Sequence, residues 1–146
     1  MDVIKKWGIS GVLLGLMVIL IMYSTQPHNT PAKNETRNKE FRWYNSPQEA
    51  IDEASKQNKR VILIFSASWC PSCRKLEEET LQNRDVLGKI SENYIAAKID
   101  VDSDPSAAST YGIYVIPTTI ILDSSGNEIG RREGYMSPEE FISYLG

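Results

Sequence analysis

The two cysteines of this chain lie three positions apart, in the segment Cys70-Pro71-Ser72-Cys73. The apolar run 61–65 precedes them and predicts a buried strand, and residues 74–81 predict a helix after them. Two thiols at this spacing can form a disulfide with each other. The start of a helix also stabilises a thiolate beside it. The segment therefore indicates a redox-active dithiol at a strand-to-helix junction.

Three other interpretations of the cysteine pair are open. A structural zinc site needs four ligands, and beside the two cysteines the chain has one histidine, His28, in a polar stretch far upstream. A purely structural disulfide would close a loop too short to remove much unfolded-state entropy. Incidental cysteines are the third alternative. The redox dithiol is favoured over all three, and it requires no metal, nucleotide or flavin cofactor.

The spacing suits exchange chemistry because a mixed disulfide must be released by a second thiol within reach. Cys70, at the helix start, is predicted to be the exposed nucleophile, and Cys73, one turn further, the less exposed resolving thiol. Pro71 suits the first helical position. Trp69 offers a flat apolar surface beside the nucleophile, although it can also be an ordinary packed aromatic. We expect Trp69 and Pro71 to contact substrate.

Length and charge limit the possible architectures and partners. The chain has 146 residues, which fits one domain of about 100 residues with an N-terminal extension. The net charge of −3 gives no support to nucleic-acid binding. The absence of further cysteines is consistent with an oxidising compartment, where a spare thiol would be a liability.

Residues 7–23 form an uncharged, mainly apolar run, preceded by Lys5 and Lys6. A helix over this run would reach ~26 Å, and snorkelling lysines with interfacial aromatics could extend it to a bilayer core of ~30 Å. We predict a cytoplasmic tail at 1–6 and a transmembrane signal anchor at 7–23. The alternative is a cleaved signal peptide and a secreted domain, but Met22-Tyr23-Ser24 matches a cleavage site poorly.

Polar residues 24–40 are predicted to form a flexible linker to the domain at 41–146. The lysines before the anchor favour a cytoplasmic N-terminus. Basic residues after it oppose that orientation: Lys33, Arg37, Lys39 and Arg42. A folded domain is translocated largely regardless of its charge. We therefore expect the domain on the extracytoplasmic side, periplasmic or outer.

The pattern from residue 41 onwards alternates strands and helices. Capping-box sequences at Ser46 and Ser137 predict two helix starts, and Pro117 separates 114–116 from a following strand. The predicted strands are 41–44, 60–67, 94–100, 118–122 and 128–132, and the predicted helices are 46–58, 74–81, 86–92, 104–111 and 137–145. This order predicts an α/β sandwich with helices on both faces of a central sheet.

The chain resembles the thioredoxin superfamily over residues 41–146. The resemblance rests on Trp69-Cys70-Pro71-Ser72-Cys73 after a buried strand, on Ile116-Pro117 before the next strand, and on the final hairpin and helix. Residues 68–81 look most like the periplasmic C-terminal domain of DsbD-type transmembrane reductases. The tethered layout also resembles membrane-anchored thioredoxin-like proteins of cytochrome c maturation. The implied fold is a thioredoxin-like sandwich with a mixed β-sheet.

The resemblance implies roles for individual residues. Cys70 would be the nucleophile and Cys73 the resolving thiol, joined as the redox disulfide Cys70–Cys73. Ile116–Pro117 would have a cis peptide bond that faces this disulfide and would offer the Ile116 backbone to an extended substrate. A proline entering a strand needs a special role because it cannot donate to the ladder. The alternative is a plain edge-strand proline.

One position departs from the thioredoxin pattern. Thioredoxins usually have a buried Asp six residues before the first cysteine, and this chain has Ile64 there. Glu77, four residues after Cys73, matches an acidic position of the DsbD-like domains and would share a helix face with Cys73. We predict that Glu77 is the proton acceptor. The alternative is a solvated member of an acidic run.

The sequence thus predicts a membrane-anchored, extracytoplasmic thiol-disulfide oxidoreductase, with the reductase direction favoured. Its partners would be thiol or disulfide-bonded proteins, joined by a transient mixed disulfide, together with a membrane electron donor. The alternatives are a disulfide oxidase or isomerase, a redox-silent peptide-binding module that uses the sheet edge and the Trp69/Pro117 groove, and a metallochaperone that shares the two thiolates.

Overall fold

The computed structural model describes Gly15, Met17, Val18 and residues 41–146. The predicted tail 1–6 and linker 24–40 lie outside the described residues, and so does most of the predicted anchor 7–23. Within the described part of the chain, no helix has the length and apolar character needed to cross a bilayer.

A five-stranded mixed sheet forms the centre of the domain. The strands are β1 (Trp43–Tyr44), β2 (Arg60–Ser66), β3 (Tyr94–Asp100), β4 (Thr118–Leu122) and β5 (Glu128–Glu133). Their order across the sheet is β1-β3-β2-β4-β5. The pairs β1–β3 and β2–β3 are parallel, whereas β2–β4 and β4–β5 are antiparallel. The predicted α/β sandwich with a mixed sheet is confirmed.

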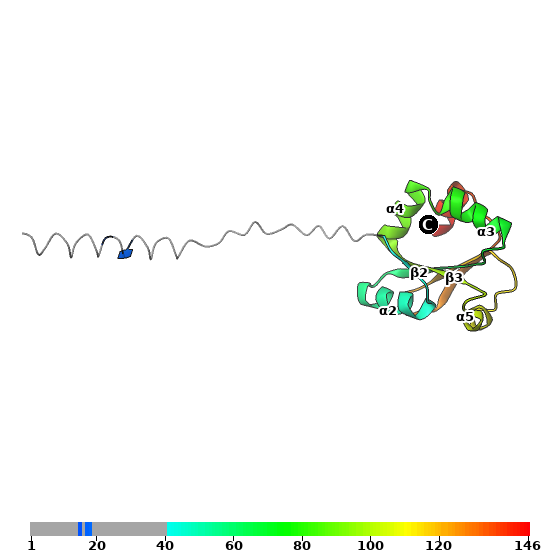
Figure 1. Cartoon of the computed structure of the whole chain (residues 1–146), viewed down its shortest axis with the longest axis horizontal. Coiled ribbons are helices and arrows are strands. Elements are labelled where there is room, and N and C mark those ends of the chain that lie inside the picture. Colours follow the sequence, from blue (N-terminus) through cyan, green and yellow to red (C-terminus); the bar gives the residue numbers. More distant parts are fainter. Residues whose placement is uncertain (1–14, 16, 19–40) are drawn as a thin grey trace, which may run out of the picture. The chain divides into compact units, whose positions relative to one another are not determined.

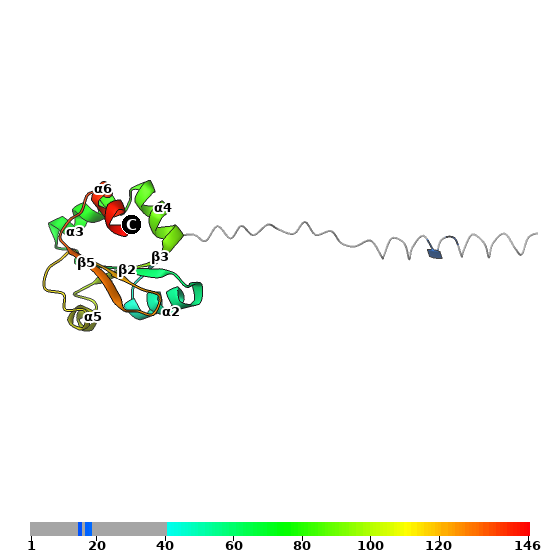
Figure 2. The same cartoon turned by 180° about the vertical axis from the view of Figure 1, so that it is seen from behind.

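Helices cover both faces of the sheet, as Figures 1 and 2 show. They are α2 (Pro47–Gln57), α3 (Pro71–Lys75), the π-helix η1 (Leu76–Thr80), α4 (Arg84–Asn93), α5 (Pro105–Thr110) and α6 (Pro138–Leu145). The face that α3, η1, α4 and α6 cover is called the α3 face, and α2 and α5 lie on the other face. Because helices cover both faces, the central strand β2 is apolar throughout its buried stretch.

Three segments of the chain meet at one edge of the sheet. The parallel strands β2 and β3 end side by side there, with Ser66 opposite Asp100. The antiparallel strand β4 begins at the same edge, with Thr118 opposite Phe65. The loop after β2, the loop after β3 and the segment before β4 are therefore brought together, and the cysteines lie in the first of them.

The helix after the cysteines differs from the predicted 74–81. It begins at Pro71, three residues earlier, and its second half is the π-helix η1. The wider turn is closed by Leu81, whose N–H donates to the Leu76 carbonyl at 2.9 Å. Thr80 at the end of η1 is fully buried, and its hydroxyl donates to the Met136 carbonyl at 2.6 Å. This contact between distant segments has no local signal in the sequence.

The two predicted capping boxes differ in outcome. At α6 the box is complete: the Glu140 N–H donates to the Ser137 hydroxyl at 3.3 Å, and the Ser137 N–H donates to the Glu140 carboxylate at 2.8 Å. At α2 the predicted box is wrong, because Ser46 is the N-cap but its side chain makes no capping hydrogen bond. Pro47 at the start of α2 is buried, so packing against the domain anchors this helix start.

Candidate active site

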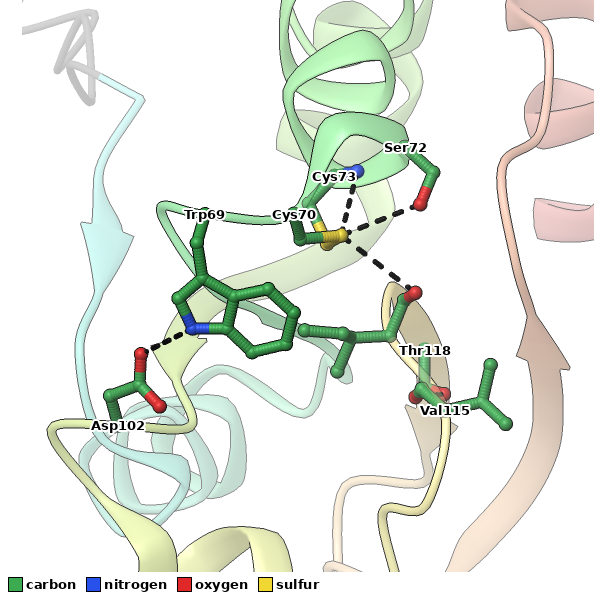
Figure 3. The surroundings of a disulfide bond; sticks show 8 residues. Trp69, Cys70, Ser72, Cys73, Asp102, Val115 and Thr118 are labelled. Carbon is green, nitrogen blue, oxygen red and sulfur yellow. Dashed lines mark hydrogen bonds between the residues drawn. A yellow bond between two sulfur atoms is a disulfide. The ribbon is translucent and has the colours of Figure 1, made fainter.

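Cys70 and Cys73 form a disulfide at the start of α3, with their Cα atoms 5.3 Å apart. Cys70 is the N-cap of α3, and its Sγ accepts a hydrogen bond from the Cys73 N–H at 3.1 Å. Figure 3 shows this bond at the sulfur. The sulfur of Cys70 therefore takes the place of a capping oxygen, where backbone N–H groups stabilise negative charge.

Exposure does not distinguish the two cysteines in the disulfide form. Cys70 is 3% exposed and Cys73 is 5% exposed, so the expectation of an exposed Cys70 is wrong for this state. The Ser72 hydroxyl lies 3.4 Å from the Cys70 Sγ and the Ile116 carbonyl oxygen lies 3.8 Å from it. Both groups lie close to the sulfur, and the two cysteines pack with Ala67 in a small buried cluster.

The segment before β4 is held against the disulfide by several hydrogen bonds. The Ile116–Pro117 peptide bond is cis, and Pro117 is buried. The Thr118 hydroxyl donates to the Val115 carbonyl at 2.6 Å, and the Gly134 N–H donates to the Pro117 carbonyl at 2.7 Å. The Ile116 carbonyl is thereby fixed beside the Cys70 sulfur.

Trp69 lies on the surface beside the disulfide and is 64% exposed. Its indole N–H donates to the Asp102 carboxylate at 2.8 Å, as Figure 3 shows. The loop that carries Asp102 is itself ordered by Asp100, whose carboxylate accepts the N–H groups of residues 102 and 103. Trp69 is therefore a positioned surface aromatic and not a buried packing residue.

Asp102 is a site residue that the sequence prediction missed. It follows the end of β3, and adjacent parallel strands end at the same edge of a sheet. An acidic residue just after the strand parallel to β2 was therefore a signal that could have placed Asp102 near the cysteine loop.

Two further apolar side chains are exposed next to the cis-proline segment. Tyr114 is 93% exposed and Val115 is 45% exposed, and Pro71, next to Cys70 in the chain, is also exposed. These residues and Trp69 give the entrance to the disulfide an apolar border. Such a border suits contact with another protein chain.

Glu77 in η1 forms an ion pair with Lys98 of β3. About half of the Glu77 side chain is exposed. The Lys98 Nζ also lies 5.3 Å from the centre of the Trp43 ring. Lys98 was not predicted as a site residue, and its partnership with Glu77 depends on the packing of η1 over the sheet.

A second group of polar contacts links α3 and η1 to the segment before α6. The Tyr135 hydroxyl donates to the Glu79 carboxylate at 2.7 Å, and the Lys75 Nζ lies 4.4 Å from the centre of the Tyr135 ring. The hydrogen bond to Glu79 raises the pKa of Tyr135 above its ordinary value. Among the described residues, no three His, Cys, Asp or Glu side chains are grouped as metal ligands would be.

Comparison with known proteins gives relatives that match this chain over different shares of its length. Human spermatogenesis-associated protein 20 is 35% identical over 77 residues, which cover 53% of this chain and 10% of that protein. The thiol:disulfide interchange protein DsbD of Colwellia psychrerythraea is 26% identical over 153 residues, which cover 95% of this chain and 25% of DsbD. The chain thus spans about a tenth and a quarter of the lengths of these two relatives.

Solved structures agree with the fold. The oxidised C-terminal domain of Neisseria meningitidis DsbD superimposes with a TM-score of 0.60 at 25% identity, covering 70% of this chain and 96% of that domain. The family model described as a thioredoxin-like domain matches residues 47–146. This chain is therefore a member of the thioredoxin-like domain family, with its Cys-x-x-Cys pair at Cys70 and Cys73.

Proposed function

We propose that this chain is a thiol-disulfide oxidoreductase that exchanges disulfides with other proteins through Cys70 and Cys73. The observation that carries the proposal is the Cys70 sulfur at the N-cap of α3, where it accepts the Cys73 N–H and faces the Ile116 carbonyl. A helix N-terminus that favours a thiolate is the environment that makes a cysteine nucleophilic.

In the reducing direction, the Cys70 thiolate attacks one sulfur of a partner's disulfide. The Cys70–partner S–S bond forms, and the partner's other sulfur leaves as a thiolate that takes up a proton. Cys73 then loses its proton and attacks the Cys70 sulfur, which releases the second partner thiolate. The partner gains two electrons and two protons, and the chain is left with the Cys70–Cys73 disulfide seen in the structure.

The partner is proposed to lie along the cis-proline segment. Ile116 is half-buried, with its backbone next to the Cys70 sulfur, and Trp69 and Pro71, the residues on either side of Cys70 in the chain, are exposed. An extended chain that carries a cysteine could contact all three, and Pro117 would hold the segment in place. Recognition would then depend on backbone contacts and apolar area, with little demand on the partner's sequence.

Glu77 is proposed to accept the proton that Cys73 loses. Its carboxylate is anchored by Lys98 at the sheet and remains about half exposed, so it can exchange protons with solvent. The ion pair keeps a charged acceptor at the helix that carries Cys73.

The reductase direction and the membrane anchor belong to the same proposal. The DsbD match covers 95% of this chain, and residues 7–23 are uncharged. An anchor there would hold the domain on the extracytoplasmic face, beside a membrane electron donor that could reduce the disulfide again. A role in cytochrome c maturation fits this layout. Full-length chain that stays in the membrane pellet after an alkaline carbonate wash would support the anchor, and release with a cleaved N-terminus would contradict it.

Insulin reduction tests the activity. The full-length chain with a dithiol reductant should accelerate insulin reduction, and Cys70→Ser should not exceed the uncatalysed rate. An active Cys70→Ser variant, or an inactive wild type, would contradict the enzyme and favour a redox-silent peptide-binding module.

The equilibrium with glutathione tests the direction. Thioredoxin-type reductases lie near −270 mV and strong oxidants near −120 mV. A wild-type potential at the reducing end of this range supports a reductase, whereas a value at the oxidising end would assign the chain as an oxidase.

A further inference from the structure

A fully buried hydroxyl group without a partner lies next to the position where the sequence departs from the thioredoxin pattern. Thr119 in β4 is 0% exposed. Its Oγ1 has no hydrogen-bond partner within the part of the chain that the structure describes. Leaving a buried hydroxyl unpaired costs free energy, and such groups are rare enough to require an explanation.

The sheet register places Thr119 directly beside Ile64. Thr119 is the Cα partner of Ile64 in β4, and Lys98 is the Cα partner of Ile64 in β3. Side chains alternate along a strand, so partners in register point to the same face. Ile64 belongs to the core of the α3 face, and Thr119 and Lys98 therefore point there too. Both neighbours of Ile64 are polar on a face that is otherwise mainly apolar.

This polar row lies under η1, which continues the helix that carries Cys73. Leu76 of η1 packs in the same core as Ile64, and Glu77 of η1 reaches Lys98. Cys73, three residues before Leu76, is buried on the inner side of α3. In the disulfide form its sulfur carries no proton and no charge. In the reduced form it becomes a buried thiol or thiolate, and a buried thiolate is stabilised by a hydrogen-bond donor.

We propose that Thr119 is the buried hydrogen-bond donor to the Cys73 sulfur in the reduced chain. In thioredoxins, the resolving thiol interacts instead with the buried Asp that usually stands where this chain has Ile64. The hydroxyl is unpaired while the disulfide is closed and becomes paired when a partner dithiol supplies two electrons and two protons to open it. Thr119 therefore favours the reduced form and stabilises the Cys73 thiolate that performs the resolving step. The inference rests on the proposed exchange, in which Cys73 is the resolving thiol.

Two substitutions isolate the hydroxyl. Thr119→Val keeps the shape of the side chain and removes the hydroxyl, whereas Thr119→Ser keeps it. With the full-length chain in glutathione buffers, Thr119→Val should shift the equilibrium toward the disulfide about fivefold, the worth of one ordinary hydrogen bond. Thr119→Ser should stay near wild type. Thr80→Val is the matched control, because its buried hydroxyl is already paired with Met136 in the disulfide form, and it should leave the equilibrium unchanged.

The Cys73 thiol gives a second readout. In a Cys70→Ser background, the pH dependence of Cys73 alkylation should move to higher pH with Thr119→Val and not with Thr119→Ser. The charged side chains in the same row of the sheet as Thr119 are Lys98, which pairs with Glu77, and Arg132 of β5, which lines a surface cleft with Glu139 and Glu140 of α6. None of them is changed by these variants.

The outcomes separate the inference from the proposed function. The inference is wrong if Thr119→Val gives wild-type values in both measurements, or if Thr119→Ser behaves like Thr119→Val. Thr119 would then be a packing residue, and the proposed exchange would still stand. A wild-type chain that does not exchange with glutathione would overturn the proposed function and this inference with it.

Discussion

Hydrogen bonding, and not exposure, gives the two cysteines different environments. Both are almost fully buried, yet only the Cys70 sulfur occupies the N-cap position and accepts a backbone N–H. The spacing of the cysteines and the position of Pro71 were enough to predict this arrangement. They were not enough to place Ile116 beside the Cys70 sulfur, because this contact joins a segment 46 residues away in the chain. The resemblance to thioredoxins was needed to predict that the Ile116–Pro117 segment faces the disulfide.

The role of Glu77 can be tested by changing one charge. Glu77→Gln keeps the size of the side chain and removes the proposed proton acceptor and the ion pair with Lys98. We expect the pH dependence of insulin reduction to move to higher pH, since Cys73 would then depend on solvent to remove its proton. Glu78→Gln, which changes the next exposed carboxylate, is the matched control and should keep the wild-type profile. A wild-type profile for Glu77→Gln as well would exclude the proposed role.

At the scale of elements, local signals predicted where most helices and strands lie, but tertiary contacts set their details. The strand predicted at 94–100 coincides with β3, because the alternation of its residues is a strong local signal. The change from α3 to η1 was not predicted. The π-helix ends at a buried contact between Thr80 and Met136, whose partners are far apart in the sequence.

The two capping boxes give a matched test of helix starts. Ser137→Ala removes a side chain that accepts the Glu140 N–H, so the free energy of unfolding should fall by about 1 kcal/mol. Ser46→Ala removes a side chain that makes no capping bond, and its effect should be clearly smaller. Urea denaturation of both variants measures the difference. Equal losses would mean that hydrogen bonding at the cap does not explain the stability of α6.

At the scale of the whole molecule, the sheet topology creates the site. The ends of β2 and β3 and the start of β4 lie at one edge, which brings Cys70, Asp102 and Ile116 together. The family resemblance was sufficient to predict the sheet and the cis-proline segment. It was not sufficient for Lys98 or Thr119, because their importance follows from the strand register beside Ile64 and not from any motif.

The stability of the domain at high pH is also a property of the whole fold. Burial raises the pKa of Tyr144 to about 12, with a smaller contribution from the charge of Glu128. The folded state therefore keeps the Tyr144 proton after the unfolded chain has lost it near pH 10. Stability that is fully present below pH 10 should be lost as the pH rises toward 12.

Tyr144→Phe should weaken this alkaline loss, as measured by urea denaturation between pH 8 and pH 12. It also removes a buried hydroxyl that has no hydrogen-bond partner among the described residues, so the variant should not be less stable at pH 8. Tyr114→Phe, at a side chain that is 93% exposed, is the control and should keep the wild-type slope. An unchanged slope for Tyr144→Phe would show that other groups cause the alkaline loss.

Trapping of the mixed disulfide tests the central claim most directly. A full-length Cys73→Ser variant, reduced and then mixed with insulin, should accumulate a covalent adduct through Cys70, visible on a non-reducing gel and released by a dithiol. Cys70→Ser should accumulate little, because Cys73 lacks the N-cap position at the start of α3. The expected result is an adduct that depends on Cys70. Equal adducts in both variants, or none in either, would contradict it.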